Sequence, residues 1–577
     1  MNGLFQKIFG ELRKNDISFY CLLFVLTAAI GGGFVFSVPL QILCLFVLLF
    51  CFSFLFINKS FKKNDIFIIA LPLIAIFISY LGADFQTNVR TASLGFLNAV
   101  LAFFIISYSN PRNKENILIT LVIFAVWVSL IIFAQVFSNA MILNVNIAAG
   151  FLILAYPLCF AFVEKNKYSV VFLLTALLIF AAVIIAKSWP AVIIVYLISF
   201  FYFIRLRKAA KIKIFFTVVS LFVLGGIIYV FKAKTGGQSL EDAFVWQKTA
   251  FLMFKDNLFF GIGYGNFGAL FAYYRPEFVL DTLFTRNIFF QLLAETGIVG
   301  ILAFIAAAFV FVKNVIASFA RFKNQNNVCL PEPCHSGLVN IHKSSNKPAP
   351  YGLNTGESIL PLSSSNKSKD NVDTGFHRYD KTERLDYANF EKNENTPYII
   401  SCAVGAAAFI VLNFCDYSFF IPANTIAFFI ICGAAFNVEA RPRNSKLAAV
   451  LILIPAAALI YVFLNVLIAD NYFKQANILK SAGNLKEAKE KYLEALKYDA
   501  KNADYWYSIS ENAVAERNYK DAAEYLLNAE KYYKYSSQIK AEAAYLYKIS
   551  GDDENAAKYA KLAKEYDKFN PFLQKIK

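Results

Sequence analysis

Apolar runs long enough to cross a membrane recur from residue 17 to residue 468 of this 577-residue sequence. A helix needs about 17 to 25 apolar residues to span a hydrocarbon core, where only helices and closed barrels satisfy their backbone hydrogen bonds. With 58% hydrophobic and 17% charged residues, the chain is too apolar for a soluble protein of this length. The sequence therefore predicts an all-α, polytopic membrane bundle of about 12 to 13 spans. The candidate spans are 17–36, 38–57, 66–82, 94–109, 117–137, 145–163, 168–186, 190–204, 214–231, 288–312, 398–417, 420–437 and 447–468.

Basic residues are concentrated in every second connection between these runs. The basic connections are 58–65, 110–116, 164–167, 205–213, 313–397 and 438–446. The short connections that alternate with them hold few cations, among them Arg90 and Lys187. This asymmetry predicts a cytoplasmic N-terminus, and an odd number of spans then places the C-terminal tail on the outer side of the membrane. The net charge of +16 then reflects membrane topology, and no nucleic-acid partner is expected.

The topology predicts the order of the domains. These are an N-terminal transmembrane bundle over 1–231, a large periplasmic loop over 232–287, a transmembrane helix over 288–312, a cytoplasmic loop over 313–397, C-terminal transmembrane helices over 398–468 and a periplasmic repeat domain over 469–577. The loop over 313–397 is rich in Asn, Ser and Lys and lacks apolar periodicity, so it is predicted to be disordered.

The same cytoplasmic loop contains all three histidines of the chain. Cys329, Cys334 and His335 form a cluster that could bind zinc, although the spacing is not that of a standard zinc finger and no second Cys/His pair follows. A plain linker is the alternative interpretation. We expect no metal and no cofactor in the functional site.

Small residues recur with a 34-residue period in the C-terminal tail. The repeated positions are Ala488, Ala522 and Ala556, and also Ala495, Ala529 and Ala563. Small residues at fixed places in a helix-turn-helix unit permit close packing of paired helices. The period resembles that of the tetratricopeptide repeat, which implies an α-solenoid of about three repeats with a concave surface for a protein or peptide partner. A purely stabilising cap is the alternative.

One polar, glycine-rich interval interrupts the apolar sequence between residues 245 and 300. It contains GIGYGNFGALFAYY over 261–274, and then Asn287, Gln291, Glu295, Gly297 and Gly300 at the start of a membrane helix. Four shorter segments precede it, namely FAQVF around Gln135, NVNIAAGFLILAYPL over 144–158, AKSWPA over 186–191 and VWQKTAFLMFKDN over 245–257. In this order and spacing, the segments resemble the O-antigen ligase and O-antigen polymerase superfamily.

That resemblance implies a multi-pass protein of the bacterial cytoplasmic (inner) membrane with one large periplasmic loop and a glycosyltransferase activity. The donor would be a glycan on a polyprenyl (undecaprenyl) diphosphate carrier. The acceptor would be lipid A core in lipopolysaccharide biosynthesis, another glycan of a polysaccharide, or a protein hydroxyl. The implied reaction is a metal-independent, inverting displacement at the outer face of the membrane.

A lipid-diphosphate-linked glycan requires cations for the diphosphate and aromatic faces for the sugars. The predicted outer face offers a set of such residues, together with glycines that permit close approach and the motif asparagine. The substrate-binding candidates are Arg90, Lys187, Lys248, Arg275, Trp189, Trp246, Tyr273, Tyr274, Gly263, Gly265 and Asn287. Interfacial anchoring is the alternative for the arginines and aromatic residues, and a tight turn is the alternative for the glycines.

The sequence departs from the superfamily pattern immediately before Asn287. Relatives usually have a histidine there, and this chain has Arg286. The catalytic candidates are therefore Arg286 and three carboxylates that could replace the missing base: Glu295, Asp281 and Glu277. The missing histidine also favours a second hypothesis, in which the chain is a catalytically degenerate membrane scaffold whose periplasmic repeats bind envelope partners.

Overall fold

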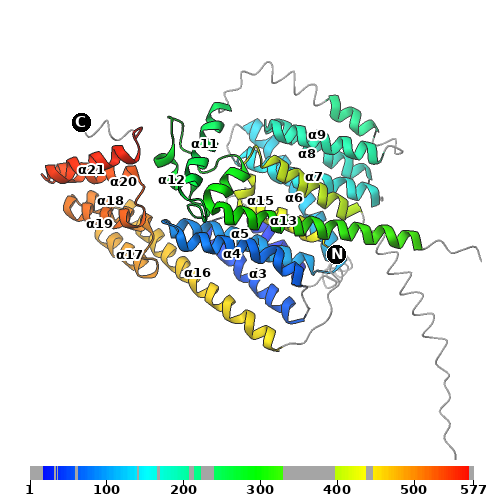
Figure 1. The fold of residues 1–577 in the computed structure, drawn as a ribbon, viewed down its shortest axis with the longest axis horizontal. Coiled ribbons are helices and arrows are strands. Elements are labelled where there is room, and N and C mark those ends of the chain that lie inside the picture. Colours follow the sequence, from blue (N-terminus) through cyan, green and yellow to red (C-terminus); the bar gives the residue numbers. More distant parts are fainter. Residues whose placement is uncertain are drawn as a thin grey trace, which may run out of the picture. The chain divides into compact units, whose positions relative to one another are not determined.

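The computed structural model describes ten segments of the chain: 17–31, 34, 37–58, 63–138, 142–165, 169–206, 213–221, 240–328, 397–436 and 446–570 (Figure 1). Within these segments the regular elements are all helices. The predicted all-α class is therefore confirmed for the part of the chain that the structure describes. The candidate zinc residues Cys329, Cys334 and His335 lie outside it, as does most of the loop predicted to be disordered.

Apolar helices occur at each of the predicted spans. The first group is α2 (Ile17–Ile30), α3 (Val38–Asn58), α4 (Lys63–Gly82), α5 (Gln86–Ser107), α6 (Pro111–Ser138), α7 (Val145–Lys165), α8 (Ser169–Ile185), α9 (Trp189–Arg205) and the helical residues described over 213–221. The second group follows the glycine-rich interval and comprises α13 (Ile288–Val328), a helix over Pro397–Leu412, α15 (Pro422–Ala435) and α16 (Lys446–Ser481).

Six helices are long and apolar enough to cross a membrane, among the described residues. They are Val38–Leu55, Gln86–Ser107, Pro111–Ser138, Val145–Lys165, Ile288–Ala317 and Ala457–Ser481. The shorter apolar helical stretches are Ile17–Ile30, Leu71–Gly82 of α4, Ser169–Ile185, Trp189–Arg205, Pro397–Leu412 and Pro422–Ala435. Several helices of this kind in one chain are consistent with a multi-pass membrane protein.

Several helices extend beyond the boundaries expected. Helix α5 begins at Gln86 and not at residue 94, so Arg90 lies within a helix and not in a connection. Helix α13 continues beyond residue 312 to Val328, so the first part of the predicted disordered loop is helical. The reason is local, because no proline or glycine follows Gly300 until Pro331. Helix α16 likewise passes through the predicted span over 447–468 and continues to Ser481, where it pairs with the first repeat helix.

Helices α5 and α7 form the centre of the membrane bundle. Helix α7 is buried along most of its length, and α5 packs against both α3 and α15. Two glycines permit the close contact between α5 and α15. A Cβ on Gly95 would lie 2.9 Å from the Pro422 ring, and a Cβ on Gly433 would lie 2.4 Å from Ile106. Small residues at helix contacts are typical of membrane bundles, where close backbone approach supplies the packing energy.

The tail is a series of antiparallel helix pairs. Its helices are the end of α16, then α17 (Leu485–Tyr498), α18 (Ala503–Ala515), α19 (Tyr519–Tyr532), α20 (Ser537–Ile549) and α21 (Asp553–Tyr566). Figure 1 shows α16 continuing from its position beside α3 to α17. Consecutive helices pack in pairs, and the six alanines spaced by 34 residues are all buried between them. The 34-residue period therefore records real packing positions.

Candidate functional site

A break in α13 holds the glycine-rich loop in place. Gly297 has φ 63° and ψ −164°, which interrupts the helix after its first turns. The backbone groups released there bind the loop: Ile262 N–H donates to the Ala294 carbonyl at 2.9 Å, and Gly263 N–H donates to the Glu295 carbonyl at 2.9 Å. A Cβ on Gly297 would lie 2.5 Å from the carbonyl of Phe259. Glycine is thus required where the loop crosses the broken helix.

Gly263 and Gly265 make close contacts with other parts of the chain. Both have positive φ, at 98° and 87°. A Cβ on Gly263 would lie 2.6 Å from Ala83, and a Cβ on Gly265 would lie 2.5 Å from Ala92 of α5. The positive φ values and these close contacts require glycine at both positions for the backbone itself.

Glu295 lies beneath the same loop. Its Oε1 accepts hydrogen bonds from Gln291 Nε2 at 2.8 Å and from the Phe267 N–H at 3.3 Å, at the start of α12 (Phe267–Tyr274). A carboxylate at a helix N-terminus is favoured by the helix dipole. Glu295 is 1% exposed, and its Oε2 has no hydrogen-bond partner among the described residues. The contacts of Glu295 join the loop, α12 and α13.

Asn287 caps the N-terminus of α13. Its Oδ1 accepts a hydrogen bond from the Phe289 N–H at 3.0 Å, and its Nδ2 donates to the Phe414 carbonyl at 3.0 Å. The neighbouring Ile288 N–H donates to the Asn413 carbonyl at 2.8 Å. These bonds seat the connection before α15 directly against the motif residues. Two segments that are more than a hundred residues apart in the sequence therefore form one site.

Arg286 lies between two aromatic rings. Its guanidinium carbon is 5.2 Å from the centre of the Trp246 ring and 5.9 Å from that of the Tyr417 ring. The Tyr417 ring itself stacks on Phe284, with centroids 5.2 Å apart and planes at 5°. Arg286 is half-buried and makes no hydrogen bond or ion pair with any described residue. Its N–H groups are thus available to a ligand, and the two rings offer the cation favourable aromatic faces.

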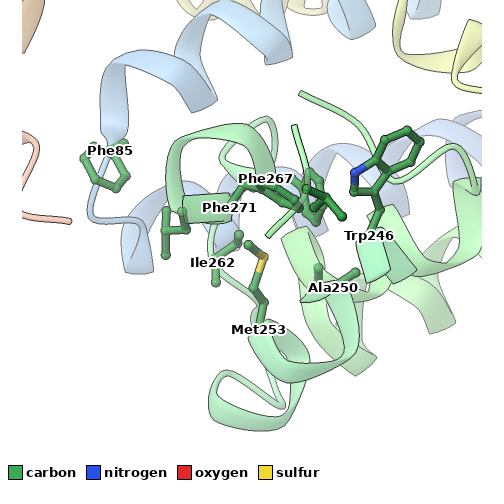
Figure 2. Close-up of a cluster of buried hydrophobic side chains, with 10 residues drawn as sticks. Phe85, Trp246, Ala250, Met253, Ile262, Phe267 and Phe271 are labelled. Atoms are coloured by element: carbon green, nitrogen blue, oxygen red, sulfur yellow. The ribbon is translucent and has the colours of Figure 1, made fainter. Parts of the chain in front are cut away.

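Trp246 is held rigidly by the packing around it. It belongs to α11 (Leu240–Asp256), is 2% exposed and forms part of a buried cluster with Met253, Phe267 and Phe271. Figure 2 shows Ala250 and Met253 following Trp246 along α11, with Phe267 and Phe271 of α12 packed beside them. This cluster positions one of the two rings that contact Arg286.

Asp416 is a site residue that the sequence analysis missed. It interacts electrostatically with Arg286, and its carboxylate accepts hydrogen bonds from the Tyr417 N–H at 2.8 Å and from Ser418 Oγ at 2.6 Å. Burial raises the pKa of Asp416, and the hydrogen bonds and the charge of Arg286 oppose that rise. The available signal was an aspartate in the short connection DYSFF, which carries no basic residue.

Arg275 and Arg90 are ion-paired with the repeat helices. Arg275 is buried and donates to Asp567 Oδ2 at 2.7 Å, to Asp281 Oδ1 at 2.8 Å and to the Val279 carbonyl. Arg90, on α5, forms an ion pair with Asp499 after α17. Both arginines were expected to bind diphosphate, and in the structure they join the repeats to the membrane bundle and its loop.

Tyr273 belongs to the same junction. Its ring centre lies 5.0 Å from that of Tyr535 and 5.2 Å from that of Tyr566. Phe85 packs edge-on against Tyr533 with centroids 4.5 Å apart, and the Tyr533 hydroxyl donates to the Ala269 carbonyl at 3.3 Å. The repeat helices therefore contact the glycine-rich loop through aromatic rings as well as through ion pairs.

Among the described residues, no hydrogen bond, ion pair or ring contact joins the remaining predicted residues to Arg286, although Tyr274 packs against the cluster that contains Trp246. Lys248 forms an exposed ion pair with Glu277 at 3.3 Å. Lys187 is exposed at the turn before α9, and Trp189 begins that helix. Tyr274 is half-buried, and burial together with the nearby Asp256 carboxylate raises the pKa of its hydroxyl.

Comparison with known proteins adds no relative: no family model matches the chain, and no curated protein matches it.

Proposed function

We propose that the chain is an O-antigen ligase-like glycosyltransferase of the cytoplasmic membrane. It would move a glycan from a polyprenyl diphosphate carrier to lipid A core, another glycan or a protein, at the outer face. The observation that carries the proposal is Arg286, a guanidinium without an ion-pair partner among the described residues, held between the rings of Trp246 and Tyr417. A guanidinium presents paired donors that match phosphate oxygens.

The residues around Arg286 support specific roles in such a reaction. The Arg286 N–H groups would bind the diphosphate and stabilise its charge as it leaves. The Asp416 carboxylate would accept the proton of the acceptor hydroxyl. The acceptor oxygen would then bond to the anomeric carbon while the bond from that carbon to the diphosphate oxygen breaks, with inversion. Asp416 suits this role better than Asp281 and Glu277, which are paired with Arg275 and Lys248.

The membrane arrangement is part of the proposal. The alternation of basic and non-basic connections supports about 13 spans, with the Arg286 site and the repeats on the periplasmic side. The 34-residue period and the paired helices support a solenoid of the tetratricopeptide type. In this role the repeats would recruit an acceptor or an envelope protein.

One observation favours a second function. Arg90 and Arg275, two cations expected to bind the donor, are ion-paired with Asp499 and Asp567 of the repeats. A chain whose cations hold its domains together would serve as a membrane scaffold for envelope partners, without turnover.

A transfer assay separates the two functions. The full chain is reconstituted in vesicles with an undecaprenyl-diphosphate-linked oligosaccharide, and lipid A core, an oligosaccharide and a serine-containing peptide are offered in turn. Arg286→Ala should reduce transfer by about a hundredfold, because it removes the donor to the leaving diphosphate. Arg205→Ala is the matched control, since Arg205 pairs with Glu164 at the end of α9. Absence of transfer by the wild-type chain with every acceptor would favour the scaffold.

A further inference from the structure

The repeat helices enclose a groove of about 690 Å³. Side chains from three helices line its walls, namely Lys480 from α16, Tyr507, Glu511 and Val514 from α18, and Glu542 and Tyr545 from α20, and Leu526 from α19 lies at its base. The three α18 residues are spaced four and three positions apart and therefore lie on one face of that helix. The groove is thus formed by the first helices of successive pairs.

The floor and wall of the groove are apolar. Leu526 and Leu546 are buried at its base, at 2% and 3% exposed. Val514 is 38% exposed and Tyr545 is 51% exposed, so both present apolar surface to an incoming ligand. A ligand that fills this groove gains by covering that surface.

The charges in the groove leave one carboxylate without a cation. Lys480 Nζ pairs with Glu511 Oε2 at 2.9 Å, so these two charges compensate each other. The Glu542 carboxylate instead accepts hydrogen bonds from neutral donors, the Tyr507 hydroxyl at 2.8 Å and Gln538 Nε2 at 3.0 Å. No lysine or arginine among the described residues forms an ion pair with it.

The two neutral donors keep Glu542 in a fixed orientation. Burial and the Glu542 carboxylate raise the pKa of Tyr507, so its hydroxyl stays protonated and remains a donor. A carboxylate oriented in this way, beside apolar surface, is complementary to a cation carried on an apolar ligand.

We propose that this groove binds a peptide segment of a partner protein that places a lysine or arginine against Glu542 and an apolar side chain between Val514 and the leucine floor. This inference rests on the recruiting role proposed for the repeats above. It specifies the chemistry of the partner that the repeats would recruit. It does not require glycan transfer, so peptide binding and transfer are separate measurements.

The test is selection of a phage-displayed random heptapeptide library against the full chain in nanodiscs. Enriched sequences should combine a lysine or arginine with an apolar residue. Synthesised and fluorescently labelled, they should bind Glu542→Gln about tenfold more weakly, because a charge-assisted hydrogen bond is lost. Val514→Lys should weaken binding as well, because it places a cation inside the groove. Glu554→Gln, a change on α21 outside the groove lining, is the matched control and should bind like the wild type.

Three outcomes would overturn the proposal: no enrichment over the unselected library, enrichment of acidic peptides, or equal binding by wild type and Glu542→Gln. Melting temperatures of the variants are measured alongside. Glu542→Gln keeps an oxygen acceptor for Tyr507, so its fold is expected to survive, and a loss of binding by a folded variant reports on the charge.

Discussion

Arg286 shows how the environment of a single residue differs from what its position in the sequence suggests. In the sequence it is a cation at a position where members of the superfamily that the chain resembles usually have a histidine. In the structure it has φ 55°, a conformation that costs a non-glycine residue energy, and two aromatic rings hold its side chain. In the proposed reaction, this arrangement would give anion binding to Arg286 and proton transfer to Asp416.

Asp416→Asn is expected to abolish transfer and to change the pH dependence of stability. Because burial raises the folded-state pKa of Asp416 above its unfolded value, the folded state binds the proton more tightly than the unfolded state does. The contribution of Asp416 to stability is therefore present in acid and is lost as the pH rises through the raised pKa. The melting temperature of Asp416→Asn, relative to that of the wild type, should therefore be higher at pH 7.5 than at pH 4.5.

A melting-temperature difference that changes with pH in the opposite direction would show that the hydrogen bonds from Ser418 and Tyr417 lower the pKa of Asp416 by more than burial raises it.

Gly297→Ala tests the contact between the broken helix and the glycine-rich loop. Gly483→Ala is a matched control, because both glycines have positive φ but only Gly297 has neighbours within 4 Å of an added Cβ. Both changes cost about 1 to 2 kcal/mol for the left-handed backbone, and Gly297→Ala adds about 1 to 3 kcal/mol of overpacking. Thermal unfolding in detergent should show the larger fall for Gly297→Ala. An equal fall in melting temperature for both variants would mean that the glycine-rich loop accommodates the added methyl group without a loss of stability.

At the scale of elements, the sequence predicted helices well and their contacts poorly. The apolar runs placed a helix at every predicted span, because hydrophobic length is a local property of the chain. The lengths of α13 and α16 were underestimated, because each helix continues after its apolar run ends. No local sequence pattern predicted the contact between the end of α12 and the end of the repeats, since Arg275 and Asp567 are nearly 300 residues apart.

Arg275→Ala is predicted to loosen that pairing. It leaves Asp567, which is 6% exposed, without its cation. Removing one partner of a buried ion pair costs about 3 to 5 kcal/mol. Hydrogen exchange should therefore speed up in α12 and α21, and Asp567→Asn introduced into the same chain should restore part of the protection. Lys248→Ala, which breaks the exposed pair with Glu277, is the control. Unchanged exchange in Arg275→Ala would show that the aromatic contacts of Tyr273 suffice.

At the scale of the whole molecule, the alternation of charge predicts which side of the membrane the tail occupies. Protease added to spheroplasts should cleave the repeat domain while the basic connection at 205–213 stays protected. A tail that is cleaved only after the membrane is permeabilised would reverse the topology and would remove the Arg286 site from the periplasm. An engineered protease site at 110–116, a second basic connection, is the internal control.

The sequence by itself determined the apolar helices, the charge asymmetry between their connections and the 34-residue period of the tail. These are repeated local patterns, and backbone geometry converts them directly into helices and packing positions. Only the tertiary structure decided which charges meet. It paired Arg90 and Arg275 with the repeats, brought Asp416 to Arg286 and left Glu542 without a cation in the described groove. The physical reason is that an ion pair depends on the distance between two side chains in space, and no spacing along the chain encodes that distance.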